Sequence, residues 1–466
     1  VDSLRVLWLN GVPQNLVAPA TDLLICEQQV LLGSCPYVYG WDGQRHVFIT
    51  DLLWAAPLGL QWTEGNPLPA RPQEWIKLPG DKLAIRDGQY QLQITEELWE
   101  AAYFDEVRLL AVDHPPDVSV YSNEKVGPPA QAAFGIHTVR QPLLPRRACD
   151  HEGRDILPQL AQADGIYPPI DEGKIAQGRV RRHAIELELG EPVDTKQLTL
   201  FLTGWTYPTT VALNLALSRD PATGLPDPPA LFVPEGDGWK CVLPAMGFPG
   251  GKTKTIAVDL AGLIVPEDPR VRIETSMEIH WDAVFYTSGE SPAELKLTEL
   301  PLQSADLHYR GFSRVDRDDS DGPEQFNYDQ VTAMPKWPPL AGGFTRFGDV
   351  QDLLAATDDR LLVMAAGDEL TLRFDAMPCP PGWQRDFLLM SVGWDKDANL
   401  ATLAGQSSEP LPFGAGRKEP PGPDEVPPAT DWYRDYLLRY QTRRQSAGFW
   451  SQFRRGDLPA VSAASP

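Results

Sequence analysis

The chain has 466 residues, a net charge of −23 and an isoelectric point near 4.7. This acidic balance argues against nucleic acid or an anionic membrane as the main partner, because both bind basic surfaces. No apolar run approaches the roughly 20 residues that a membrane-spanning helix needs, so we expect no transmembrane segment. The length predicts two to four domains.

The first predicted element is a β-hairpin over residues 4–28. Apolar side chains recur at every second position of its opening segment, LRVLW, and the Asn10-Gly11 pair that follows is a typical hairpin turn. Because an isolated hairpin is at best marginally stable in water, its partner strands should lie either elsewhere in the chain or upstream of Val1, and we expect the second.

The rest of the chain predicts a mainly β, multi-domain protein of β-sandwich units with few helices. Its 46 prolines and 38 glycines interrupt the sequence throughout. Segments rich in Val, Ile, Thr and aromatic residues predict strands at 45–50, 90–95, 106–112, 183–189, 197–205, 254–260, 270–286, 360–366 and 369–374. Short helical character is expected at 95–106, and an amphipathic helix over 431–455.

Shifts in composition predict the domain boundaries. The expected units are a terminal piece of a module (1–30), a β-rich domain (31–175), a jelly-roll-like β-sandwich (176–300), an extended connector (301–345), a small β-rich domain (346–417), a proline-rich linker (418–430), the helix (431–455) and a tail (456–466). The linker should be stiff and extended because of its prolines.

Five cysteines and seven histidines form no recognisable ligand or nucleophile pattern. The absence of CxxC pairs and Cys/His clusters argues against a zinc site. Cys26 and Cys35 are near enough in sequence to form a disulfide, although five free thiols fit the sequence equally well. We therefore expect no metal centre built from these residue types.

Four aspartates fall close together in one segment: Asp316, Asp318, Asp319 and Asp321. An EF-hand calcium loop that uses Gly322 as its central glycine would place Arg317 at the first ligand position and Tyr328 at the last, so the motif fails at both ends. We expect a solvated acidic loop and no cofactor, with a calcium site of another type as the alternative.

A second acidic group lies beside aromatic residues and comprises Glu96, Glu97, Glu100, Asp105 and Glu106. Two carboxylates about 5 to 10 Å apart are typical of glycoside hydrolases. Acidic residues are also common at helix starts because the helix dipole favours them, and this second interpretation is the one we expect. The glycine-rich segment 246–253 is one residue short of a phosphate-binding loop and precedes a strand, so it predicts a tight loop between strands.

Fourteen tryptophans are an excess for this length. Most should fill sandwich cores. Trp205 and Trp239 fall near predicted loop ends, and they are the candidates for exposed platforms that bind sugars or protein partners.

The C-terminal segment predicts a helix with one apolar stripe. Tyr433, Tyr436, Leu437 and Tyr440 recur at helical spacing, several arginines follow, and Trp450 lies in an aromatic tail. The helix could dock on the acidic body, bind another protein subunit, or make peripheral contact with a membrane surface. These five residues are therefore candidate binding residues.

Several phrases of the chain resemble a known family. The opening VDSLRVLWLNGVPQN and the later LLICEQ resemble the closing half of the ASPIC/UnbV domain. GSCPYVYGWDG, FITDLLWAAPLGL, RVRIETSMEIHWD and GWDKDANL resemble the C-terminal extension of bacterial FG-GAP (VCBS) proteins related to cartilage acidic protein. The resemblance implies a periplasmic or extracellular location and a β-propeller upstream, with none of its calcium ligands in this chain.

Residues 178–300 also resemble jelly-roll sandwiches of the galactose-binding type, which bind glycans or proteins through their end loops, although one fold hosts many functions. We therefore expect a non-enzymatic binding or scaffolding protein whose partners are other protein subunits of an envelope assembly. The alternatives are a glycoside hydrolase and a carbohydrate-binding module.

Overall fold

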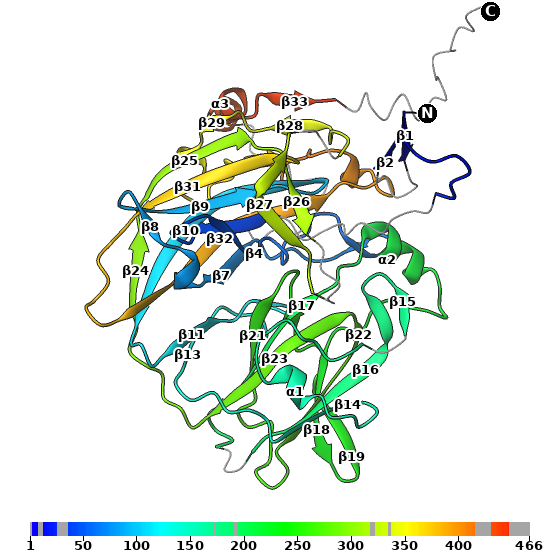
Figure 1. Ribbon diagram of the computed structural model, residues 1–466, viewed down its shortest axis with the longest axis vertical. Helices are drawn as coiled ribbons and strands as arrows, with labels where there is room; N and C mark the ends of the chain where they lie inside the picture. The colour runs from blue at the N-terminus through cyan, green and yellow to red at the C-terminus, as the bar shows by residue number, and fades with distance from the viewer. Residues whose placement is uncertain are drawn as a thin grey trace, which may run out of the picture.

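The structure is a computed structural model. It describes residues 2–7, 13–25, 36–170, 173–190, 194–316, 322–333, 337–414 and 430–446. The predicted mainly β, multi-sheet sandwich class is confirmed. Two bodies, one above the other in Figure 1, each consist of antiparallel sheets.

The upper body, here called the first sandwich, has two main sheets. The first contains β29 (Gly348–Asp349), β25 (Leu302–Tyr309), β31 (Asp368–Asp375), β9 (Gln89–Thr95), β3 (Tyr37–Trp41) and β4 (His46–Asp51), with β8 (Ile85–Arg86) beside β9. The second contains β24 (Lys296–Leu300), β10 (Glu100–His114), β32 (Gln384–Asp397) and β7 (Gln73–Leu78), with β30 (Leu362–Ala365) beside β10. Their inner faces share one apolar core, to which Leu92, Leu109, Leu370 and Phe387 belong.

The lower body, the second sandwich, also has two sheets. The larger contains β14 (Arg147–Asp150), β16 (Arg179–Glu188), β22 (Arg270–Met277), β18 (Ala230–Glu235) and β19 (Gly238–Leu243), with β15 (Lys174–Ala176) beside β16. The smaller contains β21 (Lys254–Asp259), β17 (Leu198–Thr206) and β23 (Ile279–Ser288). Leu187, Leu200, Val258 and Ile273 contribute to its core.

Small two-stranded pairings, three α-helices and three short 3-10 helices (Gly80–Lys82, Gln351–Leu353 and Ala404–Gln406) complete the described part of the chain. The two-stranded pairs are β1 (Ser3–Leu7) with β2 (Pro13–Val17), β5 (Gln61–Thr63) with β6 (Asn66–Pro67), β11 (Ser119–Ser122) with β13 (Ile136–Val139), β12 (Lys125–Val126) with β20 (Phe248–Pro249), β26 (Phe312–Asp316) with β27 (Gln325–Thr332), and β28 (Gly342–Phe344) with β33 (Arg443–Gln445). The α-helices are α1 (Leu157–Leu160), α2 (Val211–Ser218) and α3 (Asp431–Tyr440). The predicted N-terminal hairpin is thus present, whereas its Asn10-Gly11 turn lies outside the described residues.

The second sandwich is inserted into the first. The chain passes from β10 of the first sandwich into the second sandwich and returns to the first through β24. β10 and β24 are antiparallel neighbours, with Asp113 opposite Lys296. The first sandwich therefore takes strands from residues 37–114 and again from 296–397. Its sheets join segments that the sequence assigned to separate units, including β25 from the expected connector.

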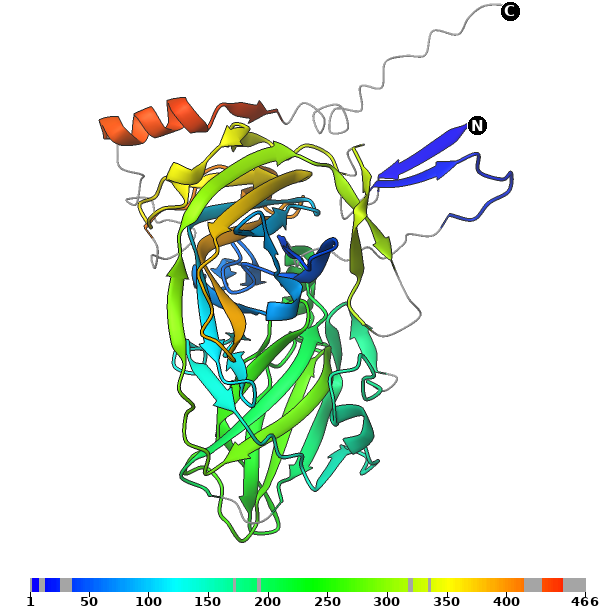
Figure 2. The same ribbon diagram turned by 60° about the vertical axis from the view of Figure 1, so that its left-hand side comes forward.

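Two helix predictions need correction. Residues 100–106, expected to be helical, belong to the long strand β10, which is paired along its length with β32. Helix α3 is present but ends at Tyr440, and residues 443–445 form β33 against β28. Figure 2 shows α3 lying along one end of the first sandwich, with the β1–β2 hairpin projecting at the side. Among the described residues, none of the helices has the length and apolar character to cross a bilayer.

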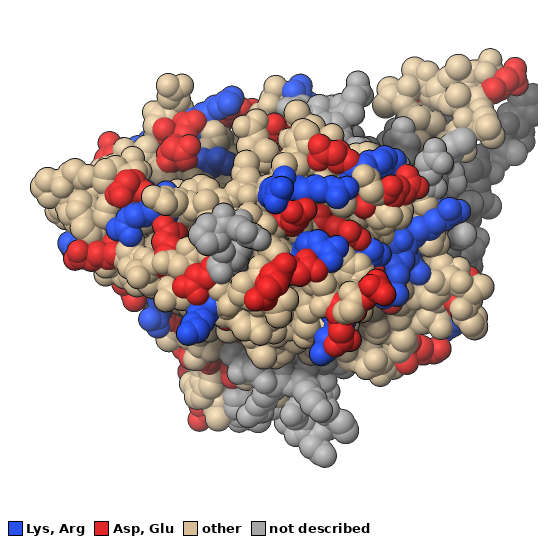
Figure 3. Space-filling model, turned by 90° about the horizontal axis from the view of Figure 1, so that it is seen from below, with Lys and Arg blue, Asp and Glu red and all other residues tan. Residues whose placement is uncertain are grey.

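Acidic and basic side chains are mixed on the surface of the second sandwich. On the face seen in Figure 3, Lys and Arg alternate with Asp and Glu. Arg272, for example, pairs with both Glu186 and Glu274 at 2.6 Å. Because opposite charges are paired locally, the described part of this face carries no large patch of a single charge.

Candidate functional site

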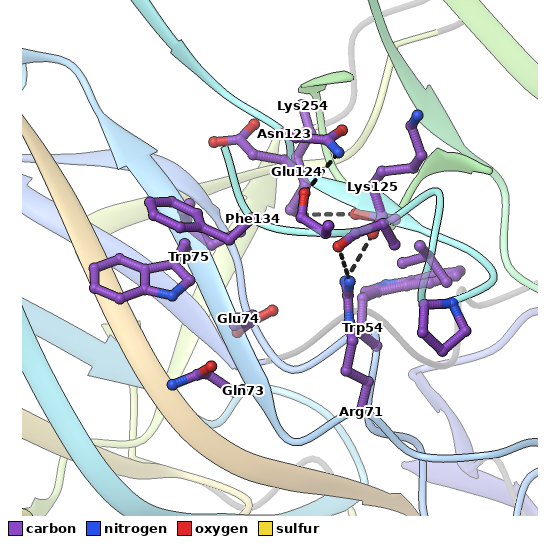
Figure 4. Close-up of a pocket in the computed structure, with 17 residues that line it drawn as sticks. Trp54, Arg71, Gln73, Glu74, Trp75, Asn123, Glu124, Lys125, Phe134 and Lys254 are labelled. Carbon is purple, nitrogen blue, oxygen red and sulfur yellow. Dashed lines mark hydrogen bonds between the residues drawn. The ribbon is translucent and has the colours of Figure 1, made fainter. Parts of the chain in front are cut away.

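One candidate site is a cavity of about 190 Å³ where the two sandwiches meet. Figure 4 shows its side chains, which come from β7 and the preceding loop, from the segment around β12, and from the start of β21. The lining combines aromatic, acidic and basic side chains, principally Trp54, Arg71, Glu74, Trp75, Glu124 and Phe134. We call this cavity the junction pocket.

One wall of the junction pocket is aromatic. The rings of Trp75 and Phe134 are stacked with centroids 4.5 Å apart and planes inclined by 24°. Phe134 is 44% exposed, so the pair forms a rim that is open to solvent. Trp54 lies on another wall and meets the ring of Phe248 edge-on. Such surfaces suit the flat apolar faces of a ligand.

Glu74, one of the two acids of the junction pocket, has a structural task. Its Oε1 accepts hydrogen bonds from the backbone N–H of Leu53 (2.6 Å) and from the hydroxyl of Ser391 (3.1 Å). Leu53 has a φ of 65°, a conformation that is strained for a bulky residue. Burial raises the pKa of Glu74. Its hydrogen bonds to Leu53 and Ser391 hold the strained loop in place, so this carboxylate has a structural role.

Glu124 joins the two sandwiches. Its Oε1 accepts from the N–H of Lys77 in the first sandwich (2.6 Å), and its Oε2 accepts from the N–H of Thr255 in the second (3.1 Å). Burial raises the pKa of this carboxyl as well. Because both oxygens are engaged by backbone donors, Glu124 is poorly placed to exchange protons with a substrate.

The basic side chains of the junction pocket also bind groups of the fold itself. Arg71 donates to the carbonyls of Ala132 and Lys125. Lys125 extends away from the cavity and donates to the carbonyl of Ala257 at 2.6 Å, and burial lowers its pKa to about 8. Lys254 donates to the carbonyl of Gly250 and pairs with Asp51.

The glycine-rich segment 246–253 is the expected connection between strands, here β19 and β21, and it contains the two-residue strand β20. Both oxygens of Asp51 accept from the N–H of Lys252 at 3.1 Å, and the Lys252 ammonium pairs with Glu324 at 3.0 Å. Gly251 has a φ of 70°, and a Cβ there would lie 1.9 Å from Asp51 and 2.4 Å from Trp54. The loop therefore docks the second sandwich onto the first.

The two candidate tryptophans lie away from this pocket. Trp205 is 3% exposed and stacks on His280, with centroids 4.6 Å apart, so the prediction of an exposed platform is wrong for it. It lies near the end of β17, where it is paired with His280 of β23, and this pairing explains the burial. Trp239 is half-buried on the edge strand β19, with the guanidinium groups of Arg270 and Arg272 over its ring.

Helix α3 packs on the body of the protein. Tyr433, Tyr436 and Tyr440 are buried in the core of the first sandwich, and Leu437 packs against it. The Tyr436 hydroxyl donates to the carbonyl of Leu361 at 2.8 Å. The apolar stripe is thus a docking face, the first of its three expected roles.

Other predicted residues remain untested. Asp316 ends β26, while Asp318, Asp319, Asp321 and Trp450 lie outside the described residues, as do Cys26 and Cys35. The calcium loop and the disulfide stay predictions. Three described cysteines, Cys149, Cys241 and Cys379, are free thiols.

The acidic residues of 96–106 do not gather on one face of a helix, because residues 100–106 belong to strand β10. Glu97 pairs with Arg310 (3.1 Å) and accepts from Ser313, and Asp105 accepts from the N–H groups of Asp358 and Asp359. Burial raises the pKa of Asp105 to about 6.

Glu100 instead meets two aspartates from the far end of the chain. One oxygen from each of Glu100, Asp395 and Asp397 lies within 4.8 Å of the others. Burial raises the pKa of Glu100 and Asp395 well above their usual values and that of Asp397 to about 6. We call these three side chains the carboxylate cluster. No local signal in the sequence predicts it, because it depends on the pairing of β10 with β32.

No family model, curated protein or solved structure matches the chain. The resemblance to the ASPIC/UnbV and FG-GAP proteins therefore stays a prediction based on the quoted phrases.

Proposed function

We propose that this protein is a non-enzymatic binding and scaffolding protein of the periplasm or extracellular space, acting as an accessory subunit of an envelope assembly. The observation that carries the proposal is the use of charge in the junction pocket. Glu74, Glu124 and Lys254 bind backbone groups or opposite charges of the fold itself. A body fixed in this way suits recognition better than proton transfer.

A protein partner is the first candidate ligand. With its inner face docked, α3 presents Trp432 and Leu438 outward, the latter 77% exposed. A groove of about 430 Å³ lies beside Trp432 and is also lined by Asp358, Arg360 and Arg439, among others. Exposed apolar side chains beside charged groups are typical of protein contact surfaces.

The test is the native mass of the protein extracted gently from its own envelope, with identification of the chains that co-migrate. We expect a defined complex that Trp432→Glu dissociates. Leu403→Glu is the control, because Leu403 is also an exposed apolar side chain and lies outside this groove. Migration of the wild-type protein as a free monomer would overturn the scaffolding proposal.

Carbohydrate binding is the second candidate, favoured by the open Trp75–Phe134 stack. Aromatic faces bind the apolar face of a sugar ring, and the side chains of Gln73 and Asn123 lie in the same lining. Trp75→Ala should abolish binding in a titration with soluble oligosaccharides, whereas Trp239→Ala should retain it. Loss in both variants, or in neither, would contradict this assignment.

Glycoside hydrolysis is the alternative that the two buried acids keep open, because raised carboxyl pKa values are a property of catalytic acids. The same oligosaccharides test it. A binding protein should leave them intact and keep its affinity in Glu74→Gln, whereas an enzyme would release products that disappear in that variant.

A further inference from the structure

The carboxylate cluster is formed by the register of two long strands. In the antiparallel pairing of β10 with β32, Glu100 lies directly opposite Asp397. Asp395 lies two residues before Asp397, and therefore on the same face of the sheet. Three acidic side chains thus converge on one point from the beginning of β10 and the end of β32.

Glu100 has no hydrogen-bond donor to satisfy it in the part of the chain that the structure describes. It is 2% exposed, and no N–H or hydroxyl group of the described residues outside the cluster donates to either of its carboxylate oxygens; Oδ1 of Asp395 also lacks such a donor. The neighbouring cation, Lys396, donates instead to the carbonyls of Ser407 and Ser408. A buried carboxylate without a partner is costly, and a bound cation would remove that cost.

We propose that Glu100, Asp395 and Asp397 bind a divalent cation, specifically calcium. The donors are all carboxylate oxygens, which hard cations prefer, and no His or Cys belongs to the cluster. The three oxygens lie within 4.8 Å of one another, so one ion can contact all of them. Calcium accepts carboxylate ligands in irregular arrangements, whereas magnesium needs a near-ideal octahedron. Asp397 is half-buried, which leaves room for water ligands on its side.

The ion would fasten the first sandwich where its two longest strands end. β10 and β32 form the centre of one sheet, and the chain continues from Asp397 into the segment that reaches Ser407 and Ser408. This role is structural and does not depend on the proposed binding function.

Calcium titration of the full chain, after treatment with a chelator, tests the site. At a concentration about 100 times Kd, a ligand of the folded state should raise Tm by about 3 °C for a protein of this size. Glu100→Gln should lose this shift while remaining folded, because it also removes the repulsion within the cluster. Glu106→Gln is the matched control on the same strand and should keep the shift, because Glu106 is paired with Arg108 and Thr357.

Terbium luminescence gives a readout that does not depend on stability. Terbium occupies calcium sites, and Trp99 and Trp394 adjoin the cluster in sequence, so excitation of tryptophan should sensitise its emission. We expect emission in the wild type and in Glu106→Gln, and at least a tenfold loss in Glu100→Gln. Wild-type protein with neither a thermal shift nor emission, or Glu100→Gln with both, would overturn the proposal.

Discussion

At the junction of the two sandwiches, Asp51 faces Lys254 and the N–H of Lys252, whereas at the ends of β10 and β32 Glu100 faces Asp395 and Asp397. Both groups are buried, and both join segments far apart in sequence. The first balances each charge inside the protein, and the second gathers charges of one sign. A buried charge can therefore be either balanced by an opposite charge or left among charges of its own sign, and only the neighbouring side chains distinguish the two cases.

The difference has energetic consequences. A buried pair that loses one partner leaves an uncompensated charge, which costs several kcal/mol. A cluster of like charges that loses one member becomes easier to bury. Substitutions of similar size should therefore have opposite effects in the two regions.

The largest effect should come from Lys254→Met, which leaves the carboxylate of Asp51 buried without its cation. We expect a loss of about 3 to 5 kcal/mol in the free energy of unfolding, measured by denaturant titration. Arg219→Ala is the control at the same junction. Its pair with Glu64 is 63% and 74% exposed, so it should cost less than about 1 kcal/mol. Equal costs would mean that burial does not decide the value of these pairs.

A smaller loss should follow Gly251→Ala, because the added Cβ meets Asp51 and Trp54 in a left-handed conformation. We expect about 3 kcal/mol by the same titration. Gly236→Ala is matched in backbone conformation, with a φ of 59° and open space around the Cβ, and should cost about 1 kcal/mol. A cost for Gly251→Ala no larger than this would show that the loop does not press against Asp51.

Lys125 lies between the two extremes, because its charge meets a carbonyl and no carboxylate. Its folded pKa of about 8 is below the value of about 10.4 in an unfolded chain. The charged form therefore destabilises the fold below pH 8, and this penalty is relieved as the pH rises from 8 to 10. Relative to Lys125→Met, wild-type stability should rise by about 2 kcal/mol over that interval. Lys240→Met, at an exposed lysine, should show no such difference, and a flat profile for Lys125 would contradict its desolvation.

The local pattern of apolar and β-branched residues was sufficient to predict most of the strands. The predicted segments at 90–95, 254–260 and 369–374 correspond to β9, β21 and β31. Residues 100–106 were misassigned because Glu and Ala favour helices locally, whereas pairing with β30 and β32 imposes a strand. Propensity in a strand depends on neighbours that the local sequence does not contain.

The candidate sites were less accessible to sequence reasoning. Glu74, Glu124 and Lys254 come from three separate segments and meet only because the second sandwich is inserted into the first. Glu100 and Asp397 are almost 300 residues apart, and only the strand register brings them together. The apolar stripe of α3 was visible in the sequence, but the surface that it covers was not.

The insertion also determines how long the strands of the first sandwich remain without their partners during synthesis. β10 ends at His114 and its central partner β32 begins at Gln384, so 269 residues must be made between them. At roughly 5 to 20 residues per second, this interval lasts on the order of tens of seconds. The second sandwich can close during that time, while the apolar faces of β3, β9 and β10 wait for their partners. The hazard of aggregation on the ribosome therefore falls on the half of the molecule that begins first and finishes last.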